Sequence, residues 1–219
     1  MADDELSAAQ RQQWQDTYLA HPGMYGTMPS SAAVHAAEVF AESGVDTVLE
    51  LGAGHGRDAL FLAHRGFTVH ATDFSPAALA QLRAAATALG LADKVSTGEY
   101  DVRHQSPLPD ASVDAVFAHM LLCMTLTTPQ LHALVDEVRR VLRPGGAFVY
   151  TVRHTGDAQY GAGTSHGDDI YESGGFAVHF FSRQLVDALA EGWRLREVHA
   201  FEEGVLPRRL WRITQTLPG

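Results

Sequence analysis

The chain has 219 residues, 46% of them hydrophobic, and a formal net charge of −10. Its length and composition suit one globular domain with a sizeable core. The acidic charge argues against a nucleic-acid partner, because phosphate binding needs clustered lysine and arginine. No apolar stretch reaches membrane-spanning length, and the N-terminus lacks the apolar run of a signal peptide. The single cysteine, Cys123, suits a reducing compartment, so we expect a cytoplasmic protein without a membrane partner.

Two amphipathic helices are predicted near the N-terminus. The first covers residues 5–20 and carries Trp14 and Tyr18 near one side, and the second runs from Ser30 or Ser31 to about Glu42. Either serine is a good N-cap for the second helix. The two aromatic residues either cover a ligand site or pack on the edge of a sheet, and the pattern leaves both possibilities open.

Residues 47–56 read Thr-Val-Leu-Glu-Leu-Gly-Ala-Gly-His-Gly and predict a buried strand followed by a tight turn. A helical pattern begins directly afterwards at Arg57. Strand, glycine turn and helix together are typical of a nucleotide-type site, although any α/β protein can use such a turn without a ligand. A dinucleotide fingerprint would place its third glycine at position 57, whereas this chain has G-x-G-x-G at Gly52, Gly54 and Gly56.

The second strand is predicted over residues 67–72 and ends at Asp73, which lies 21 residues after Gly52. A carboxylate at this distance is placed to accept hydrogen bonds from both hydroxyls of a ribose. The alternative is a helix cap, since Ser75-Pro76 opens the next helical pattern and aspartate caps well. The glycine turn at the right distance favours ribose binding.

The middle of the chain continues to alternate helices and strands. We predict helices over residues 76–89 and 128–142, and strands over residues 94–97, 113–118 and 147–152. Arg143-Pro144-Gly145-Gly146 is predicted to close the second of these helices, with glycines that allow the chain to reverse into the next strand. The segment from His119 to Met124 follows a strand end, where ligands of open α/β sheets bind.

Residues 153–179 contain six glycines and three histidines, His154, His166 and His179. A loop of this length inside a compact domain is usually functional, so we expect it beside a ligand site. A helix from Ser182 to about Ala190 follows. Trp193–Phe201 and Leu206–Thr216 then predict an antiparallel pair of strands at the edge of the sheet.

Four features in order resemble the class I S-adenosylmethionine (SAM) methyltransferases. They are E-L-G-A-G-H-G from Glu50, the acidic residue Asp73, the pair Asp101-Val102, and V-R-R-V-L-R-P-G-G-A-F-V-Y over residues 138–150. The resemblance covers residues 45–152 well and the rest by architecture. Within this superfamily, G-H-G-R-D and the stretch over residues 61–79 are similar to the small-molecule methyltransferases of the tellurite-resistance and thiol-methylating group.

The resemblance implies a Rossmann-like α/β fold with a seven-stranded, mostly parallel sheet, an antiparallel last strand and helices on both faces. It implies one methyltransferase domain over residues 1–219, with a helical cover (1–44), a SAM-binding core (45–152), an acceptor-side loop (153–181) and a C-terminal helix and strand pair (182–219).

The resemblance also implies the contacts of SAM. In the family, the residue at Glu50 helps to hold the ammonium group, the residue at Asp73 the ribose, and the residue at Asp101 the adenine amino group, while that at Val102 covers the ring. The full set of expected SAM-binding residues is Glu50, Gly52, Ala53, Gly54, Gly56, Asp73, Phe74, Asp101, Val102, Ala118 and Tyr25.

The expected reaction is methyl transfer by in-line displacement to a heteroatom (S, O or N) of a small-molecule acceptor. A general base is needed only when the attacking atom carries a proton of high pKa. His154 is the first candidate base and His119 the second, because both are predicted at carboxyl ends of strands. Either histidine could instead be a hydrogen-bonded wall or surface residue. No metal is expected, because the histidine spacings match no zinc pattern.

Two other functions remain open at this level, an NAD-dependent oxidoreductase and a non-catalytic SAM-binding protein. Arg57, at the position where a dinucleotide site needs glycine, argues against the first. The long segment of residues 153–179 argues against the second, because a pure binding module has little use for an acceptor cover. The sequence is compatible with a monomer or a homodimer.

Overall fold

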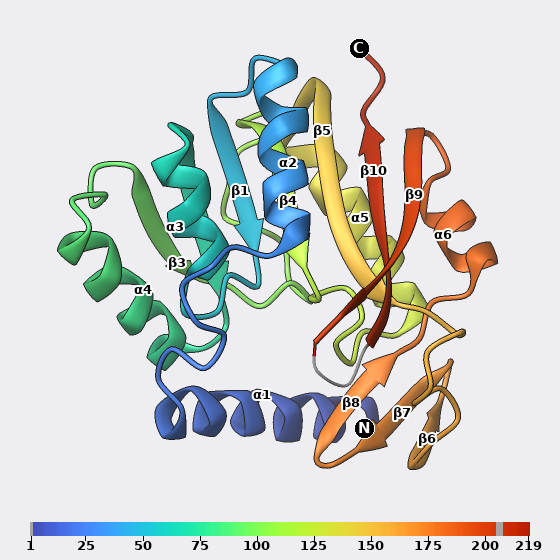
Figure 1. Cartoon of the computed structure of the whole chain (residues 1–219). Coiled ribbons are helices and arrows are strands. Elements are labelled where there is room, and N and C mark those ends of the chain that lie inside the picture. Colours follow the sequence, from blue (N-terminus) through green and yellow to red (C-terminus); the bar gives the residue numbers. More distant parts are fainter. Residues whose placement is uncertain (1, 205–207) are drawn as a thin grey trace.

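A seven-stranded sheet forms the centre of the structure, with the strand order β3-β2-β1-β4-β5-β10-β9 (Figure 1). The computed structural model describes residues 2–204 and 208–219. The first five strands in this sheet order, β3-β2-β1-β4-β5, are parallel to one another. Strand β10 is antiparallel to both of its neighbours, β5 and β9. The predicted sheet is therefore confirmed. Its strands are β1 Thr47–Leu51, β2 Thr68–Asp73, β3 Val95–Glu99, β4 Val113–His119, β5 Leu142–Arg153, β9 Arg194–Glu203 and β10 Arg208–Thr216.

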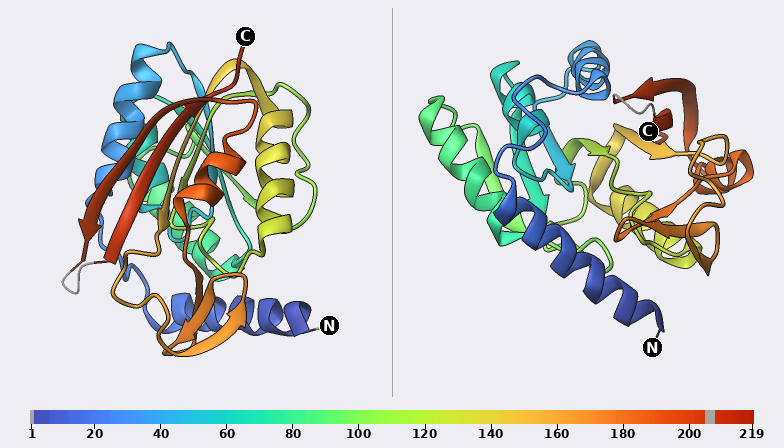
Figure 2. Two further views of the ribbon diagram at one scale, coloured as in Figure 1. Left: turned by 90° about the vertical axis from the view of Figure 1, so that its right-hand side faces the viewer. Right: turned by 60° about the horizontal axis from the view of Figure 1, so that its bottom comes forward.

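Helices cover both faces of this sheet. Helices α2, α3 and α4 contribute to one core layer, and α5 and α6 to the other. Helix α1 instead crosses below the carboxyl ends of the parallel strands (Figures 1 and 2). No helix of the described residues is both long and apolar enough to cross a membrane. The helices are α1 Ala2–Ala20, α2 Ser31–Glu42, α3 Arg57–His64, α4 Pro76–Ala88, α5 Thr128–Val141 and α6 Arg183–Leu189.

Alternate residues of the central strands face the two helical layers. Val48 of β1 and Phe117 of β4 pack with α2, α3 and α4, whereas Leu49 and Val116 pack with α5 and α6. Because parallel strands are covered on both faces, their sequences are nearly continuous apolar runs. This double burial places the polar ends of the strands, rather than their faces, at the surface where a ligand can bind.

Serine side chains begin three of the helices, as the sequence predicts. The hydroxyl oxygen of Ser30 accepts a hydrogen bond from the backbone N–H of Ala33 at the start of α2. Ser75 caps α4 and Ser182 caps α6 in the same way. Each cap satisfies a backbone N–H that has no partner within its own helix.

The structure corrects the loop predicted over residues 153–179, because much of it forms a second, three-stranded sheet. The strands are β6 Thr164–Gly167, β7 Ile170–Ser173 and β8 Phe176–His179, in the order β6-β7-β8. Gly174 and Gly175 join β7 to β8 with φ angles of 62° and 83°. A two-residue turn with positive φ is the usual hairpin connection, so this Gly-Gly pair between alternating residues was the missed signal.

The start of β5 also differs from the prediction. Leu142 pairs with Val113 and Ala147 pairs with Ala115, so Arg143–Gly146 bulges from the start of β5 rather than preceding it. Gly145 has a φ of 80°, which suits glycine in this bulge. The first two residues of the predicted strand Leu206–Thr216 lie outside the described residues.

We predict that Ser30→Ala lowers the free energy of unfolding by about 1–3 kcal/mol. Ser30 lies in a buried junction between α2 and α3, where its N–H and its hydroxyl donate to the two carboxylate oxygens of Asp58 at 2.7 and 2.8 Å. Alanine removes both the cap and one partner of a buried carboxylate. Urea denaturation of both proteins measures the difference.

Ser43→Ala is the matched control. Its exposed hydroxyl only donates to the carbonyl of Val39 at 2.9 Å, so we expect a change within about 0.5 kcal/mol. Equal losses in the two variants would contradict the role given to the Ser30–Asp58 junction.

Candidate active site

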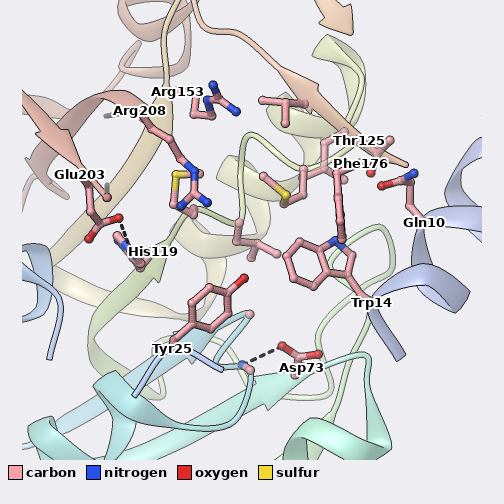
Figure 3. Close-up of a pocket in the computed structure, with 18 of the residues that line it drawn as sticks. Gln10, Trp14, Tyr25, Asp73, His119, Thr125, Arg153, Phe176, Glu203 and Arg208 are labelled. Carbon is pink, nitrogen blue, oxygen red and sulfur yellow. Dashed lines mark hydrogen bonds and ion pairs between the residues drawn. The ribbon is translucent and has the colours of Figure 1, made fainter. Parts of the chain in front are cut away.

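A cavity of about 1160 Å³ opens at the carboxyl ends of the central strands. Its floor is the glycine turn after β1 together with the ends of β2 and β4, and α1 and β8 cover it (Figure 3). Trp14 of α1 and Phe176 of β8 form an aromatic wall, with ring centroids 4.9 Å apart. The position is the one at which open α/β sheets bind ligands.

The glycine turn at residues 52–56 needs glycine at each of its three positions. Gly52, Gly54 and Gly56 have φ angles of 68°, 56° and 91°. A Cβ atom on Gly54 would lie 2.5 Å from the hydroxyl oxygen of Tyr18, and one on Gly56 would lie 2.1 Å from a methyl group of Leu82. Gly52 and Gly54 line the cavity, whereas Gly56 is the N-cap of α3 and does not line it. Gly56 therefore shapes the turn rather than the cavity wall.

Glu50 presents an unpartnered carboxylate oxygen at the cavity. The residue is 3% exposed, and its Oε2 atom has no hydrogen-bond partner among the described residues. Burial, and secondarily the charge of Asp58, raises the pKa of this carboxyl well above its usual value. An orphaned buried acceptor of this kind is costly unless a ligand donates to it. Glu50 is thus suited to a ligand ammonium group, as the resemblance implies.

Asp73 is held at the end of β2 by backbone donors. The N–H groups of Gly54 and Ser75 each donate to one of its oxygens at 2.8 Å. Burial raises the pKa of Asp73 to about 6, although these hydrogen bonds act in the opposite direction. Because Ser75 itself caps α4, the alternative reading of Asp73 as the helix cap is wrong. Each carboxylate oxygen keeps acceptor capacity for a ribose hydroxyl.

Asp101 lines the cavity but already binds two guanidinium groups. Arg11 of α1 lies 2.9 Å from its Oδ2 atom and Arg103 lies 2.7 Å from the same atom. Burial alone would raise the pKa of Asp101, but the hydrogen bonds from Arg103 and the two positive charges hold it below its usual value. The predicted contact of Asp101 with adenine stays a prediction. The structure shows in addition that Asp101 ties α1 to the core.

Five further predicted residues fall into different places. Phe74 and Val102 line the cavity beside the carboxylates, and Tyr25 lines it with its ring stacked on His55 at 5.9 Å. Ala53 lines the floor. Ala118 does not line the cavity, because it is fully buried in the core layer shared with α5 and α6. The alternation along β4 turns Ala118 inward and brings the following residue, His119, to the cavity.

The two candidate bases are in different environments. His119 lines the cavity, with Nδ1 2.9 Å from the hydroxyl of Thr151 and Nε2 3.3 Å from Glu203. His154 does not line the cavity. Its ring stacks on Trp211 at 4.5 Å, and its Nδ1 atom accepts from the N–H of Gly156. This geometry reverses the ranking, since the sequence placed His154 first.

Several cavity residues escape prediction from the sequence. Helix α1 supplies Arg11, and the edge strands supply Glu203 and Arg208. Trp14 and Tyr18 were noted as a possible cover, and the structure places both on the cavity. Glu203 and Arg208 lie about 150 residues from the glycine turn and carry no local motif, so no sequence signal marked them.

Residues 48–146 match the family model described as a methyltransferase domain. An uncharacterised methyltransferase of Synechocystis sp. is 34% identical over 113 residues, which cover 49% of this chain and 47% of that protein. The chain thus matches less than half the length of this relative.

Residues 48–146 therefore form the core of a SAM-dependent methyltransferase domain.

Two solved structures share the fold of this methyltransferase domain. The 1,6-didemethyltoxoflavin N1-methyltransferase of Burkholderia thailandensis, with bound S-adenosylhomocysteine, has a TM-score of 0.76 at 17% identity, covering 100% of this chain and 92% of its own. The N-methyltransferase NodS of Bradyrhizobium japonicum has a TM-score of 0.70 at 15% identity, covering 96% of this chain and 100% of its own. At these identities the likeness shows the fold alone.

The cavity of the methyltransferase domain fits SAM by its donor and acceptor groups. Glu50 offers an unpartnered oxygen to a cationic group, and Asp73 offers two oxygens to a pair of hydroxyls. The turn at Gly52 and Gly54 has no side chains that would fill the space in front of it. The contact of each single residue with SAM stays a prediction.

We predict that the affinity for S-adenosylhomocysteine falls about tenfold between pH 7 and pH 5. The pKa of Asp73 is raised to about 6 in the free protein, so the carboxylate that accepts both hydroxyls becomes protonated over this range. The contribution of Asp73 to folding stability changes with pH in the direction opposite to that of ligand affinity. The folded state binds this proton more tightly than the unfolded chain, so the Asp73 contribution to stability decreases as pH rises from about 4 to 6.

Asp73→Asn removes the inflection near pH 6 and weakens binding at pH 7 at least tenfold, or about 1.4 kcal/mol. Calorimetric titration over the pH range measures both effects. Asp93→Asn, an exposed residue, is the control and should leave the profile unchanged. An inflection that persists in Asp73→Asn would assign the titration to another group.

Proposed function

We propose that the protein transfers the methyl group of SAM to a heteroatom, sulfur, oxygen or nitrogen, of a small-molecule acceptor. The observation that carries this proposal is the size and continuity of the cavity. Its volume of about 1160 Å³ exceeds the ~300–1,000 Å³ of most single-ligand pockets. It extends from Glu50 and Asp73 to the aromatic wall of Trp14 and Phe176, which leaves room for an acceptor beside the cofactor.

The enclosure of the cavity favours a small acceptor. Helix α1 and the sheet β6-β7-β8 lie side by side across the strand ends (Figure 2). The side-chain amide of Gln10 joins them, donating to the carbonyl of Gly175 at 2.9 Å and accepting from the N–H of Ala177 at 3.1 Å. A macromolecular acceptor would have to displace this cover. The buried single thiol of Cys123 supports a reducing compartment, which we take to be the cytoplasm.

The mechanism proposed is an in-line displacement that the protein aligns and shields from water. SAM, when bound, supplies a methyl group already activated by its positive sulfur. Glu50 would hold the ammonium group of the cofactor and Asp73 its ribose, and Trp14 and Phe176 exclude water from the acceptor side. Alignment of two reactants can lower the barrier by about 7–11 kcal/mol, so the reaction needs little further chemistry from the protein.

His119 is the residue proposed to take a proton from the acceptor. The hydroxyl oxygen of Thr151 accepts from the N–H of Met120 and can also accept from Nδ1–H of His119, the tautomer that leaves a lone pair on Nε2. Nε2 of His119 faces Glu203 at 3.3 Å, longer than the ~2.7–2.9 Å of a tight charged pair. A proton-bearing heteroatom of the methyl acceptor can approach this nitrogen in place of Glu203. Once His119 has taken the proton, the carboxylate of Glu203 stabilises the imidazolium that forms. His154 does not line the cavity, so it is not placed to take this proton.

The similar structure from Burkholderia guides the choice of acceptors. It belongs to an N-methyltransferase of a flat nitrogen heterocycle, 1,6-didemethyltoxoflavin. We therefore propose nitrogen heterocycles, besides thiols and small phenols, as the first classes to test. An NAD-dependent activity is disfavoured by Arg57 at the required glycine position.

Calorimetric titration with SAM and S-adenosylhomocysteine should show micromolar binding of both and no binding of NADH. Gly54→Ala should weaken binding at least tenfold, because its Cβ atom would lie 2.5 Å from the Tyr18 hydroxyl in a backbone with a φ of 56°. Gly98→Ala is the matched control, since its Cβ atom meets only a methyl group at 3.8 Å. NADH binding without binding of either adenosyl ligand would overturn the assignment.

His119→Gln should lower kcat about 10²-fold for phenol or N–H acceptors and less than tenfold for thiols, which ionise near neutral pH. Its affinity for S-adenosylhomocysteine should not change. His154→Gln should stay within twofold of the unmodified protein. Steady-state rates across pH 6–9 check these expectations, and a loss in His154→Gln equal to that in His119→Gln would reverse the assignment.

A further inference from the structure

The arginines at the acceptor side of the cavity are paired with carboxylates, with one exception. Arg153 binds Asp157 at 2.5 Å, and both side chains are almost completely buried. Arg57 binds Asp58 at 3.1 Å, and Arg209 binds Glu202 at 3.4 Å. Among the side chains that the structure describes, no carboxylate lies within 4.0 Å of the guanidinium group of Arg208.

Arg208 nevertheless points into the cavity. It is the first residue of β10, and Figure 3 shows its side chain reaching inward toward Tyr25 from the same side as Glu203. The pKa of Glu203 lies below its usual value, first because His119 donates a hydrogen bond and further because of the charges of Arg57 and Arg208. The guanidinium group is therefore close enough to act on Glu203 without forming an ion pair with it.

The opposite side of the acceptor space is apolar. Trp14, Phe176 and Met124 line it, and the rings of the first two pack with their centroids 4.9 Å apart and their planes tilted by 57° (Figure 3). A flat apolar molecule can lie against such a wall. The combination of an aromatic wall and an unpaired guanidinium group selects a molecule with a flat body and an anionic group at one end.

We propose that the acceptor is a flat small molecule with a carboxylate or an equivalent anionic oxygen, and that Arg208 binds this group. The proposal rests on the proposed methyltransferase function. A local cation is required, because the chain carries a net charge of −10 and its overall field does not attract an anion.

The anionic group bound by Arg208 anchors the acceptor and is not the atom that is methylated. A paired cation withdraws electron density from an oxygen and lowers its nucleophilicity. The methylated heteroatom is therefore a different atom of the same molecule. The negative charge of Glu203 opposes an anion in this place, and the nearby positive charges of Arg57 and Arg208 act against it.

The test uses the full chain saturated with S-adenosylhomocysteine and matched pairs of an acid and its amide. Salicylate with salicylamide and indole-3-carboxylate with indole-3-carboxamide are suitable probes, and calorimetry or quenching of tryptophan fluorescence reports binding. We expect at least one acid to bind tenfold or more tightly than its amide. Arg208→Gln should abolish this preference, and Arg208→Lys should retain part of it.

Two controls separate the possible outcomes. Arg196→Gln makes the same charge change on β9 outside the cavity and should keep the preference for acids. The affinity for S-adenosylhomocysteine should not change in Arg208→Gln. A tenfold loss there would mean that Arg208 binds the carboxylate of the cofactor and would overturn the proposal.

The proposal is also overturned if no acid of the panel exceeds its amide, or if the preference survives in Arg208→Gln. Failure of the unmodified protein to bind S-adenosylhomocysteine at all would instead contradict the proposed function, so the two failures are distinguishable. Circular dichroism and thermal unfolding confirm that each variant is folded.

Discussion

The hydrogen bond from the N–H of Gly54 to the carboxylate of Asp73, at 2.8 Å, joins the turn after β1 to the end of β2. This contact depends on the left-handed backbone of the glycine turn, which directs the N–H toward β2 rather than into a helix. It sets the distance between the floor of the cavity and the carboxylate that is proposed to bind a ribose. A side chain on Gly54 would also displace Tyr18, so the same turn positions α1.

Helix α1 is tied to the site mainly by polar contacts. Gln15 accepts hydrogen bonds from the hydroxyl of Ser75 and the N–H of Ala77, Arg11 pairs with Asp101, and Gln10 bonds to the backbone of β8 and the turn before it. These partners lie at the ends of elements that border the proposed cofactor part and the proposed acceptor part of the cavity. The helix therefore joins the two halves of the cavity, and its position determines how well both are shielded from water.

The same fold hosts different reactions, so the chemistry of this domain depends on its cavity residues. Glu50 and Asp73, the residues proposed to contact the cofactor, lie within 25 residues of one another in the sequence. His119, Glu203 and Arg208 belong to the acceptor side and come from three different strands or their ends. The carboxylates near the glycine turn are the groups proposed to bind the cofactor, and the residues from the distant strands are those proposed to set the acceptor specificity.

Local pattern was enough for the succession of strands and helices along the chain, the capping serines and the glycine turn with its neighbouring carboxylates. Strand, glycine turn and carboxylate lie close together in the chain, and their geometry follows from backbone rules that act over a few residues. The sequence does not predict the sheet β6-β7-β8, because its four-residue strands alternate only weakly between apolar and polar residues. The Gly174-Gly175 turn is then indistinguishable from an irregular loop. Ala118 and His154 were misplaced, because the alternation of strand faces and the stacking of His154 on Trp211 become visible only when the strands are assembled.

The succession of strands and helices along the chain, the glycine turn and the carboxylates beside it were determined by the sequence itself, since each depends on residue types at short spacing. The closure of the cavity by α1 and the meeting of His119, Glu203 and Arg208 were decided only by tertiary structure. These residues approach one another because β9 and β10 add to the sheet edge beyond β5 and bring their ends beside β4. Pairing between distant segments depends on packing across the whole sheet, and no short pattern in the sequence encodes it.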